Sequence, residues 1–152
     1  MSKNLRVKSI SHIDETTSIP FKFNGKTYHG FKGDTLASAL LANGIHLVGR
    51  SFKYHRPRGI MSAGSEEPNA IVQVGNDKAI TEPNVRATEV EIHEGLEATS
   101  QNCWPSVNFD IGGINNLLSP FLPAGFYYKT FMWPASFWGK YEYFIRHSAG
   151  LG

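Results

Sequence analysis

The sequence contains very little cysteine: a single residue, Cys103, among 152. One thiol cannot form a disulfide within the chain, and it cannot supply the set of thiolates that a cysteine-held zinc ion or iron–sulfur cluster needs. The six histidines are scattered, without the H-x3-H type of spacing that is typical of paired metal ligands. We therefore expect no disulfide and no metal site in this chain, and the scarcity of cysteine favours a reducing compartment, the cytoplasm.

A strong excess of charge and a long apolar run are also missing. The 15 lysine and arginine residues nearly balance the 13 aspartate and glutamate residues, so the formal net charge of +2 does not favour nucleic acid or an anionic membrane as the main partner. No apolar run approaches the roughly 18 residues of a membrane span, and the N-terminus lacks the apolar core of a signal peptide. These absences predict a soluble, intracellular protein that binds neither nucleic acid nor membrane.

Residues 18–102 carry the local signals of a small α+β domain, preceded by an N-terminal arm at residues 1–17. Asn24 and Gly25 stand between segments rich in aromatic residues, and both tolerate positive φ, so they predict a tight β-hairpin. Further strands are expected within residues 69–75, 85–92 and 95–102. This order predicts a mixed sheet crossed by one main helix.

The helix is expected directly after the hairpin. Asp34 or Thr35 can cap its start, and Gly44 is suited to its end. Its apolar side is expected to hold Leu36, Ala39, Leu40 and Leu41. The basic segment that follows, residues 49–59, is interrupted by proline and glycine and is expected to form a loop.

The composition changes at Cys103, where an extension over residues 103–152 begins. Thirteen of the 19 aromatic residues and four of the eight prolines lie from Trp104 onward. This segment has too much aromatic surface for a solvated tail and too many prolines for a sheet. We expect it to be irregular, with a short helix over residues 138–146, and to pack against a large partner surface.

Four runs carry a resemblance to a known family: GDTLASALLANGI at residues 33–45, SFKYHRPRGIM at 51–61, EPNAIVQV at 67–74 and PNVRAT at 83–88. Together with the aromatic run that begins KTFMWP, they resemble the amino-terminal segment of the alpha subunit of heterotetrameric sarcosine oxidase. The resemblance implies a ferredoxin-like β-grasp domain, followed by an extension that leads toward a dinucleotide-binding domain.

Related amine and amino-acid dehydrogenases carry a 2Fe–2S cluster in the matching domain, in a loop of the form R-G-x-x-C-x4-C-x2-C with a fourth cysteine after N-V-R-A. With Arg58-Gly59 as the anchor, the four ligand positions fall on Ser62, Glu67, Ala70 and Thr88. None is a thiol, and the cluster prefers soft thiolate ligands. The resemblance thus implies a domain that has lost its cluster and keeps its shape. Glu66 and Glu67 form an acid pair that is expected to be solvated.

Five residues of the basic segment invite two interpretations: Arg50, Lys53, His55, Arg56 and Arg58. One is an anion site for a nucleotide phosphate, because arginine makes bidentate contacts with phosphate. The other is docking onto a neighbouring domain or subunit, which the lack of a glycine-rich phosphate cradle favours. Trp133 and Trp138 in the extension are further candidate interface residues. Cys103 beside Trp104-Pro105 is expected to be an inert packing residue.

The resemblance implies a role as a structural and interaction module with no catalytic or cofactor-binding residue of its own. The complex of that family oxidatively demethylates sarcosine to glycine, with tetrahydrofolate as one-carbon acceptor and hydrogen peroxide as product, and uses FAD, FMN and NAD. The implied partners are the rest of the alpha subunit and the other subunits. The alternatives are a module of a related amine or amino-acid dehydrogenase complex, a domain that still carries electrons, and a stand-alone nucleotide-binding module.

Overall fold

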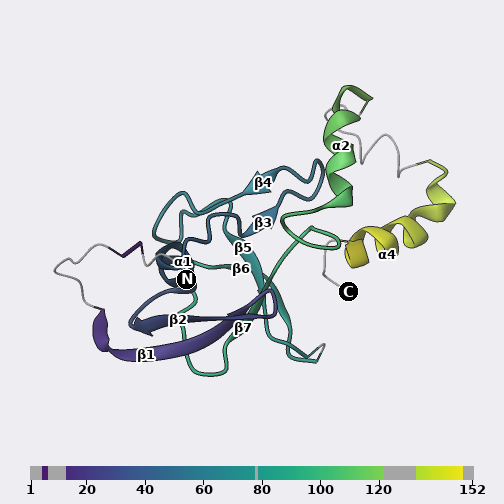
Figure 1. The fold of residues 1–152 in the computed structure, drawn as a ribbon. Helices are drawn as coiled ribbons and strands as arrows, with labels where there is room; N and C mark the ends of the chain where they lie inside the picture. The colour runs from purple at the N-terminus through teal and green to yellow at the C-terminus, as the bar shows by residue number, and fades with distance from the viewer. Residues whose placement is uncertain (1–4, 7–12, 78, 122–132, 149–152) are drawn as a thin grey trace.

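The computed structural model describes residues 5–6, 13–77, 79–121 and 133–148 (Figure 1). Its main sheet has five strands in the order β2-β1-β7-β5-β6. The strands are β1 (Asp14–Phe23), β2 (Lys26–Lys32), β5 (Ile71–Val74), β6 (Glu82–Arg86) and β7 (Glu97–Ser100). β1 and β7 run parallel, and the other neighbouring pairs run antiparallel. The predicted mixed sheet is confirmed, and β1 begins inside the expected N-terminal arm.

The predicted hairpin and helix are both present. Asn24 and Gly25 connect β1 to β2 with φ of 50° and 74°. Helix α1 (Leu36–Ala42) begins after Thr35, whose hydroxyl accepts a hydrogen bond from the Ser38 amide at 3.2 Å. Gly44, with φ of 76°, follows the end of the helix. Local turn and cap chemistry therefore sets these two elements.

The core lies between α1 and the sheet. Leu36, Leu40 and Val72 are completely buried, and Phe21 and Phe23 of β1 point into the same cluster. The buried side of α1 differs from the prediction at two positions: Ala37 is buried, and Leu41 is only partly buried.

The strand expected within residues 85–92 is wrong beyond Arg86, where the chain turns. The reason is tertiary: the carbonyl groups of Ala87 and Val90 accept hydrogen bonds from the amides of Ala37 and Leu36 at 2.9 and 2.7 Å. These bonds satisfy the first amides of α1, which have no partner within the helix. If residues 87–90 continued as a strand, the first amides of α1 would lose these two hydrogen bonds.

The basic segment forms a small two-stranded hairpin, β3 (Gly49–Arg50) and β4 (Pro57–Arg58), around a loop. The expected loop is therefore confirmed, with two-residue strands at its ends. The long loop between β4 and β5 contains the first three ligand positions of the cluster frame, and the fourth, Thr88, lies in the turn after β6.

The extension lies beyond the β3–β4 hairpin, away from the five-stranded sheet (Figure 1). It contains α2 (Ile114–Leu117) and α4 (Trp138–Ser148), with 3-10 turns η1 (Ile111–Gly113), η2 (Ser119–Phe121) and η3 (Ala135–Phe137). The helix expected over residues 138–146 is thus present as α4. Among the described residues, no helix has the length and apolar character needed to cross a bilayer.

Candidate functional site

Hydrogen bonds bring the three frame positions of the β4–β5 loop and Thr88, in the turn after β6, close together in the fold. Glu67 bonds to the backbone amides of both Ser62 and Ala70, and the Thr88 hydroxyl donates to the Gly64 carbonyl at 2.8 Å. Ala70 is completely buried and Thr88 is 6% exposed. The loop thus packs around Glu67 and is tied to the turn that contains Thr88.

The side chain of Glu67 is the polar centre of this loop. The residue is 1% exposed, and its carboxylate accepts hydrogen bonds from the amides of Met61, Ser62, Asn69 and Ala70 at 2.6–3.1 Å. Burial raises the pKa of this carboxyl, but the amide hydrogen bonds outweigh burial and lower the pKa to about 2. The expected solvated acid pair is therefore wrong for Glu67, although Glu66 is exposed.

The donor set does not fit a 2Fe–2S cluster. Ser62 and Thr88 offer hydroxyl oxygens, Glu67 offers a carboxylate that the loop amides already engage, and Ala70 offers no donor atom. Iron in such clusters is held by thiolates, and hard oxygen ligands are poor substitutes. Within the described part of the chain, no group of three or more His, Cys, Asp or Glu residues is placed to hold a metal ion.

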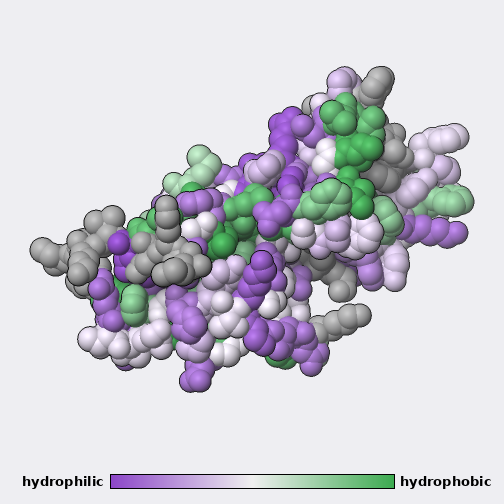
Figure 2. Space-filling model, viewed as in Figure 1, coloured by the Kyte–Doolittle hydropathy of each residue, from purple (hydrophilic) through white to green (hydrophobic). Residues whose placement is uncertain are grey.

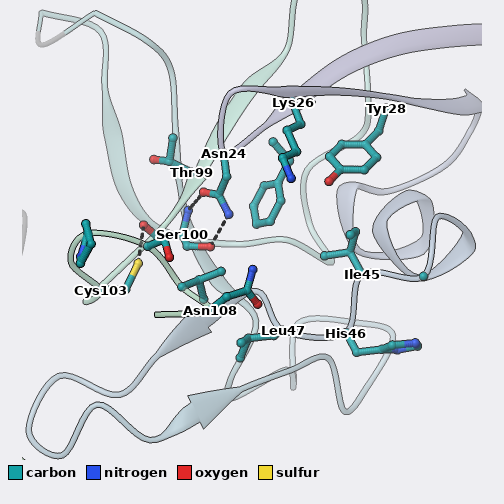
Figure 3. Close-up of a pocket in the computed structure, with 15 residues that line it drawn as sticks. Asn24, Lys26, Tyr28, Ile45, His46, Leu47, Thr99, Ser100, Cys103 and Asn108 are labelled. Atoms are coloured by element: carbon teal, nitrogen blue, oxygen red, sulfur yellow. Dashed lines mark hydrogen bonds between the residues drawn. The ribbon is translucent and has the colours of Figure 1, made fainter. Parts of the chain in front are cut away.

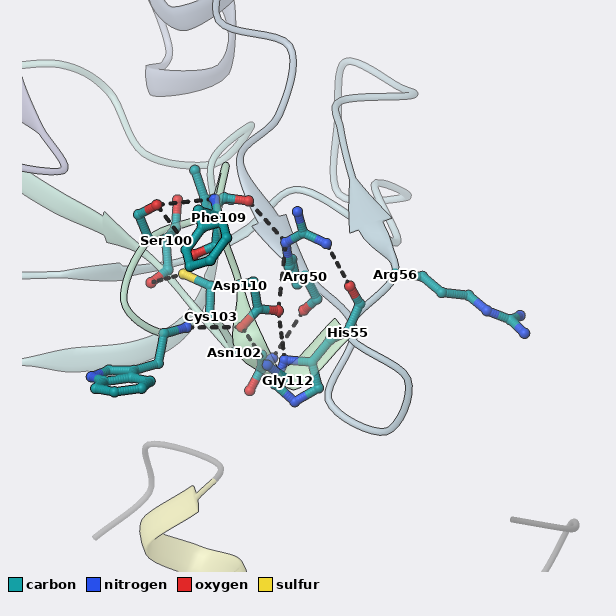
Figure 4. Close-up of polar contacts among 12 residues, drawn as sticks. Arg50, His55, Arg56, Ser100, Asn102, Cys103, Phe109, Asp110 and Gly112 are labelled. Atoms are coloured by element: carbon teal, nitrogen blue, oxygen red, sulfur yellow. Dashed lines mark hydrogen bonds and ion pairs between the residues drawn. The ribbon is translucent and has the colours of Figure 1, made fainter. Parts of the chain in front are cut away.

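The basic segment contacts the extension of the same chain (Figure 4). Arg50 donates from Nε to the carbonyl oxygen of Val107 at 2.8 Å, and His55 Nδ1 lies 2.8 Å from Asp110 Oδ2. Arg56 Nε donates to Asn116 Oδ1 at 3.0 Å. We call this set of contacts the junction.

Asp110 is the central anion of the junction. Its side chain is completely buried, and Oδ1 accepts from the amides of Trp104 and Gly112 at 3.0 and 3.2 Å. Arg50 Nε lies 3.6 Å from Oδ2. Burial raises the pKa of this carboxyl, but the Trp104 amide and His55 outweigh burial and hold the pKa below its usual value. Asp110 thus ties the start of the extension to the β3–β4 hairpin as a carboxylate.

The remaining predicted interface residues make other contacts or lie at the surface. Arg58 donates to Asn69 Oδ1 at 2.6 Å, and Lys53 lies over the Tyr54 ring with its Nζ 4.9 Å from the centroid. Trp133 and Trp138 are 81% and 48% exposed. Their role as contacts with other domains or subunits remains a prediction.

An open cleft of about 760 Å³ lies between the β1–β2 hairpin and residues 103–108 (Figure 3). Lys26, Tyr28, His46 and Asn108 contribute to its walls, with Cys103 at one side. Burial and the charge of Asp110 raise the pKa of the Cys103 thiol. A raised pKa favours the unreactive thiol, which agrees with a packing role.

Neither the role of Asp110 nor the burial of Glu67 was predicted from the sequence. Asp110 stands before Ile111-Gly112-Gly113, and its side chain caps the short η1 turn. An aspartate before a glycine-rich turn is a recognisable cap signal. The four-amide environment of Glu67 had no such local signal.

The sheet order, the single crossing helix and the long β4–β5 loop define a β-grasp fold of the ferredoxin type. Residues 16–103 match the family described as 2Fe-2S iron-sulfur cluster binding domain, and the chain belongs to this family. Its ligand positions nevertheless lack thiols.

Individual proteins give a narrower comparison. The chain is 64% identical over 141 residues to sarcosine oxidase subunit alpha of Rhizobium meliloti (strain 1021), which covers 92% of this chain and 14% of that protein. It is 41% identical over 105 residues to sarcosine oxidase subunit alpha of Corynebacterium sp. (strain U-96), covering 65% of this chain and 11% of that protein. It thus spans only a small part of the length of these relatives. The crystal structure of L-proline dehydrogenase from P. horikoshii aligns with 61% of this chain and 16% of its own, at 22% identity and a TM-score of 0.46.

Proposed function

We propose that the chain is the amino-terminal structural module of the alpha subunit of a sarcosine oxidase complex. The 64% identity to the alpha subunit from R. meliloti, over 92% of this chain, carries this proposal. The complex would oxidatively demethylate sarcosine to glycine, with tetrahydrofolate as one-carbon acceptor and hydrogen peroxide as product. FAD, FMN and NAD would be bound by its other parts.

The site geometry supports a structural role for this segment. The two buried carboxylates described above, Glu67 and Asp110, are both engaged by backbone amides and held ionised, so neither is poised as a general acid or base near neutral pH. The Cys103 thiol has a raised pKa, which disfavours a nucleophilic thiolate. These groups hold the loop and the extension in place.

The surface of the extension supports a role in assembly. Figure 2 shows strongly hydrophobic side chains gathered in the region that α2 occupies in Figure 1. Eleven large apolar or aromatic residues of the described extension are 45% exposed or more: Trp104, Phe109, Ile111, Ile114, Leu117, Leu118, Trp133, Phe137, Trp138, Tyr143 and Phe144. Exposed apolar surface on this scale is typical of an interface. We assign it to the remaining alpha subunit and the other subunits of the complex.

The contacts of the basic segment argue against phosphate binding and favour a structural role within the chain. Arg50, Arg56 and Arg58 each donate a hydrogen bond to another part of the same chain. A phosphate would have to compete with these partners. The scarcity of cysteine further supports a cytoplasmic complex.

A tagged copy of the protein, purified from the organism that encodes it, tests this function. We expect larger flavin-containing subunits to copurify with it, and we expect the purified complex to release hydrogen peroxide when sarcosine is added. Turnover of another amine or amino acid, with no activity on sarcosine, would instead favour a related dehydrogenase complex. A tagged protein that is recovered alone and binds a nucleotide would contradict the assembly role.

A further inference from the structure

The β4–β5 loop contains a cradle of backbone amides that converge on one point. Met61 and Ser62 supply two N–H groups to Glu67 Oε2 at 2.7 and 2.6 Å. Asn69 and Ala70 supply two more to Oε1 at 2.8 and 3.1 Å. The donors come from both arms of the loop, and the carboxylate joins the two arms.

Converging backbone amides form a site for an anion, because each N–H presents the positive end of its dipole to the same point. Hydrogen bonds to the sulfur atoms are likewise a general part of iron–sulfur sites, where the cluster is anionic. In this chain the two pairs of donors include the first and third frame positions, Ser62 and Ala70. The acceptor is the side chain of the second frame position, Glu67.

We propose that the Glu67 carboxylate is a built-in anion that replaces the cluster as the organiser of the β4–β5 loop. The cradle is therefore an anion site that its own chain fills, and a variant without the Glu67 side chain has a vacant site for a small carboxylate such as formate. This proposal concerns the loop alone, so it stands or falls independently of the proposed function in a sarcosine oxidase complex.

The other contacts of Glu67 favour an anion over a neutral polar group. The Ser62 hydroxyl also donates to the carboxylate at 3.2 Å. In all five hydrogen bonds that the structure assigns to the Glu67 side chain, the carboxylate is therefore the acceptor. A neutral glutamine amide could accept at its oxygen, but its NH2 group would face two amide donors. The hydrogen bonds from the four backbone amides also lower the pKa of Glu67.

Glu66 provides a matched control, because it has the same side chain at the adjacent position and is exposed. Amide hydrogen exchange of the 152-residue chain, followed by NMR, is measured for the wild type, Glu67→Gln and Glu66→Gln. We expect Glu67→Gln to raise the exchange rates of the amides at 61, 62, 69 and 70 about tenfold or more, as the loss of hydrogen bonds to a charged acceptor predicts. Glu66→Gln should leave these rates unchanged. Unchanged rates in Glu67→Gln would overturn the proposal.

Chemical rescue tests the vacant site. Sodium formate added to Glu67→Ala should restore slow exchange at the four cradle amides in a saturable manner, and sodium chloride at equal ionic strength serves as the salt control. If Glu67→Ala folds and formate has no effect beyond that of the salt, the proposal fails. Should Glu67→Ala not fold, a 13C NMR titration of the wild-type Glu67 side-chain carboxyl decides: a midpoint well below the ordinary glutamate pKa of 4.5 supports the built-in anion, and a midpoint near 4.5 overturns it.

Discussion

Replacing Asp110 by asparagine removes the central charge of the junction and keeps the shape of the side chain. The Asp110 side chain is completely buried and accepts hydrogen bonds from two amides and from His55, while Arg50 Nε lies 3.6 Å from its Oδ2. In the variant, the NH2 group must face either the amide donors or the His55–Arg50 pair. Both arrangements leave a buried donor without its acceptor.

The magnitude follows from the exposure of the partners. Stranding one member of a fully buried ion pair costs about 3–5 kcal/mol. Arg50 and His55 keep 13% and 20% exposure of their side chains, so water recovers part of the loss. We expect the contact between the extension and the hairpin to weaken by about 2–3 kcal/mol, which corresponds to roughly 30- to 150-fold more frequent local opening.

Hydrogen exchange with mass spectrometry measures this opening directly. Peptides covering residues 104–113 should exchange faster in Asp110→Asn, while peptides from β1, β2 and α1 keep their wild-type rates. Asp77→Asn in an exposed turn is the matched control, and it should change neither region. If residues 104–113 exchange at the wild-type rate in Asp110→Asn, the junction does not hold the extension in place, and our account of the basic segment is refuted.

Three further predictions concern the junction, the loop and the interface. Gly112→Ala should weaken the junction by about 1–3 kcal/mol in urea unfolding, because an added Cβ would overlap the His55 ring. If the variant is as stable as the wild type, the His55 ring has room to move and the prediction is wrong. The lowered pKa of Glu67 predicts stability that is fully present above about pH 4.5 and is lost as the pH falls through about 2. The full shift corresponds to about 3 kcal/mol at most. Urea unfolding between pH 7 and 2 should show this loss in the wild type and not in Glu67→Gln. Equal pH dependence of the two proteins would contradict the assignment. Trp133→Ser should lower the yield of the copurified complex without changing unfolding of residues 18–102, whereas an unchanged yield would exclude this exposed ring from the interface.

The hairpin and α1 could be predicted from sequence because their signals are local. Asn24 and Gly25 accept the positive φ that the turn requires, and Thr35 caps the helix with its own hydroxyl. These conformations depend on residues within a few positions of each other. The mixed sheet could be predicted from the order in which the hairpin, the helix and the later strands occur along the chain.

The features that sequence reasoning missed depend on distant parts of the chain. The turn after Arg86 exists because the start of α1 needs carbonyl partners from residues 87–90. Two adjacent glutamates in a polar loop suggest exposure, and only the folded loop brings the amides of Ser62 and Ala70 to Glu67. The role of Asp110 likewise depends on its contacts with Arg50 and His55, which are more than 50 positions away in sequence.

The loss of the cluster from a domain of this family is the central claim, and anaerobic reconstitution tests it most directly. The purified chain is incubated with iron, sulfide and a thiol reductant, desalted, and analysed for iron and acid-labile sulfide, with visible and paramagnetic resonance spectra as the second readout. Because Ser62, Glu67, Ala70 and Thr88 present no thiolate, we predict far less than stoichiometric iron and sulfide and no cluster spectrum. Two iron and two sulfide ions per chain, with the spectrum of a 2Fe–2S centre, would contradict the account.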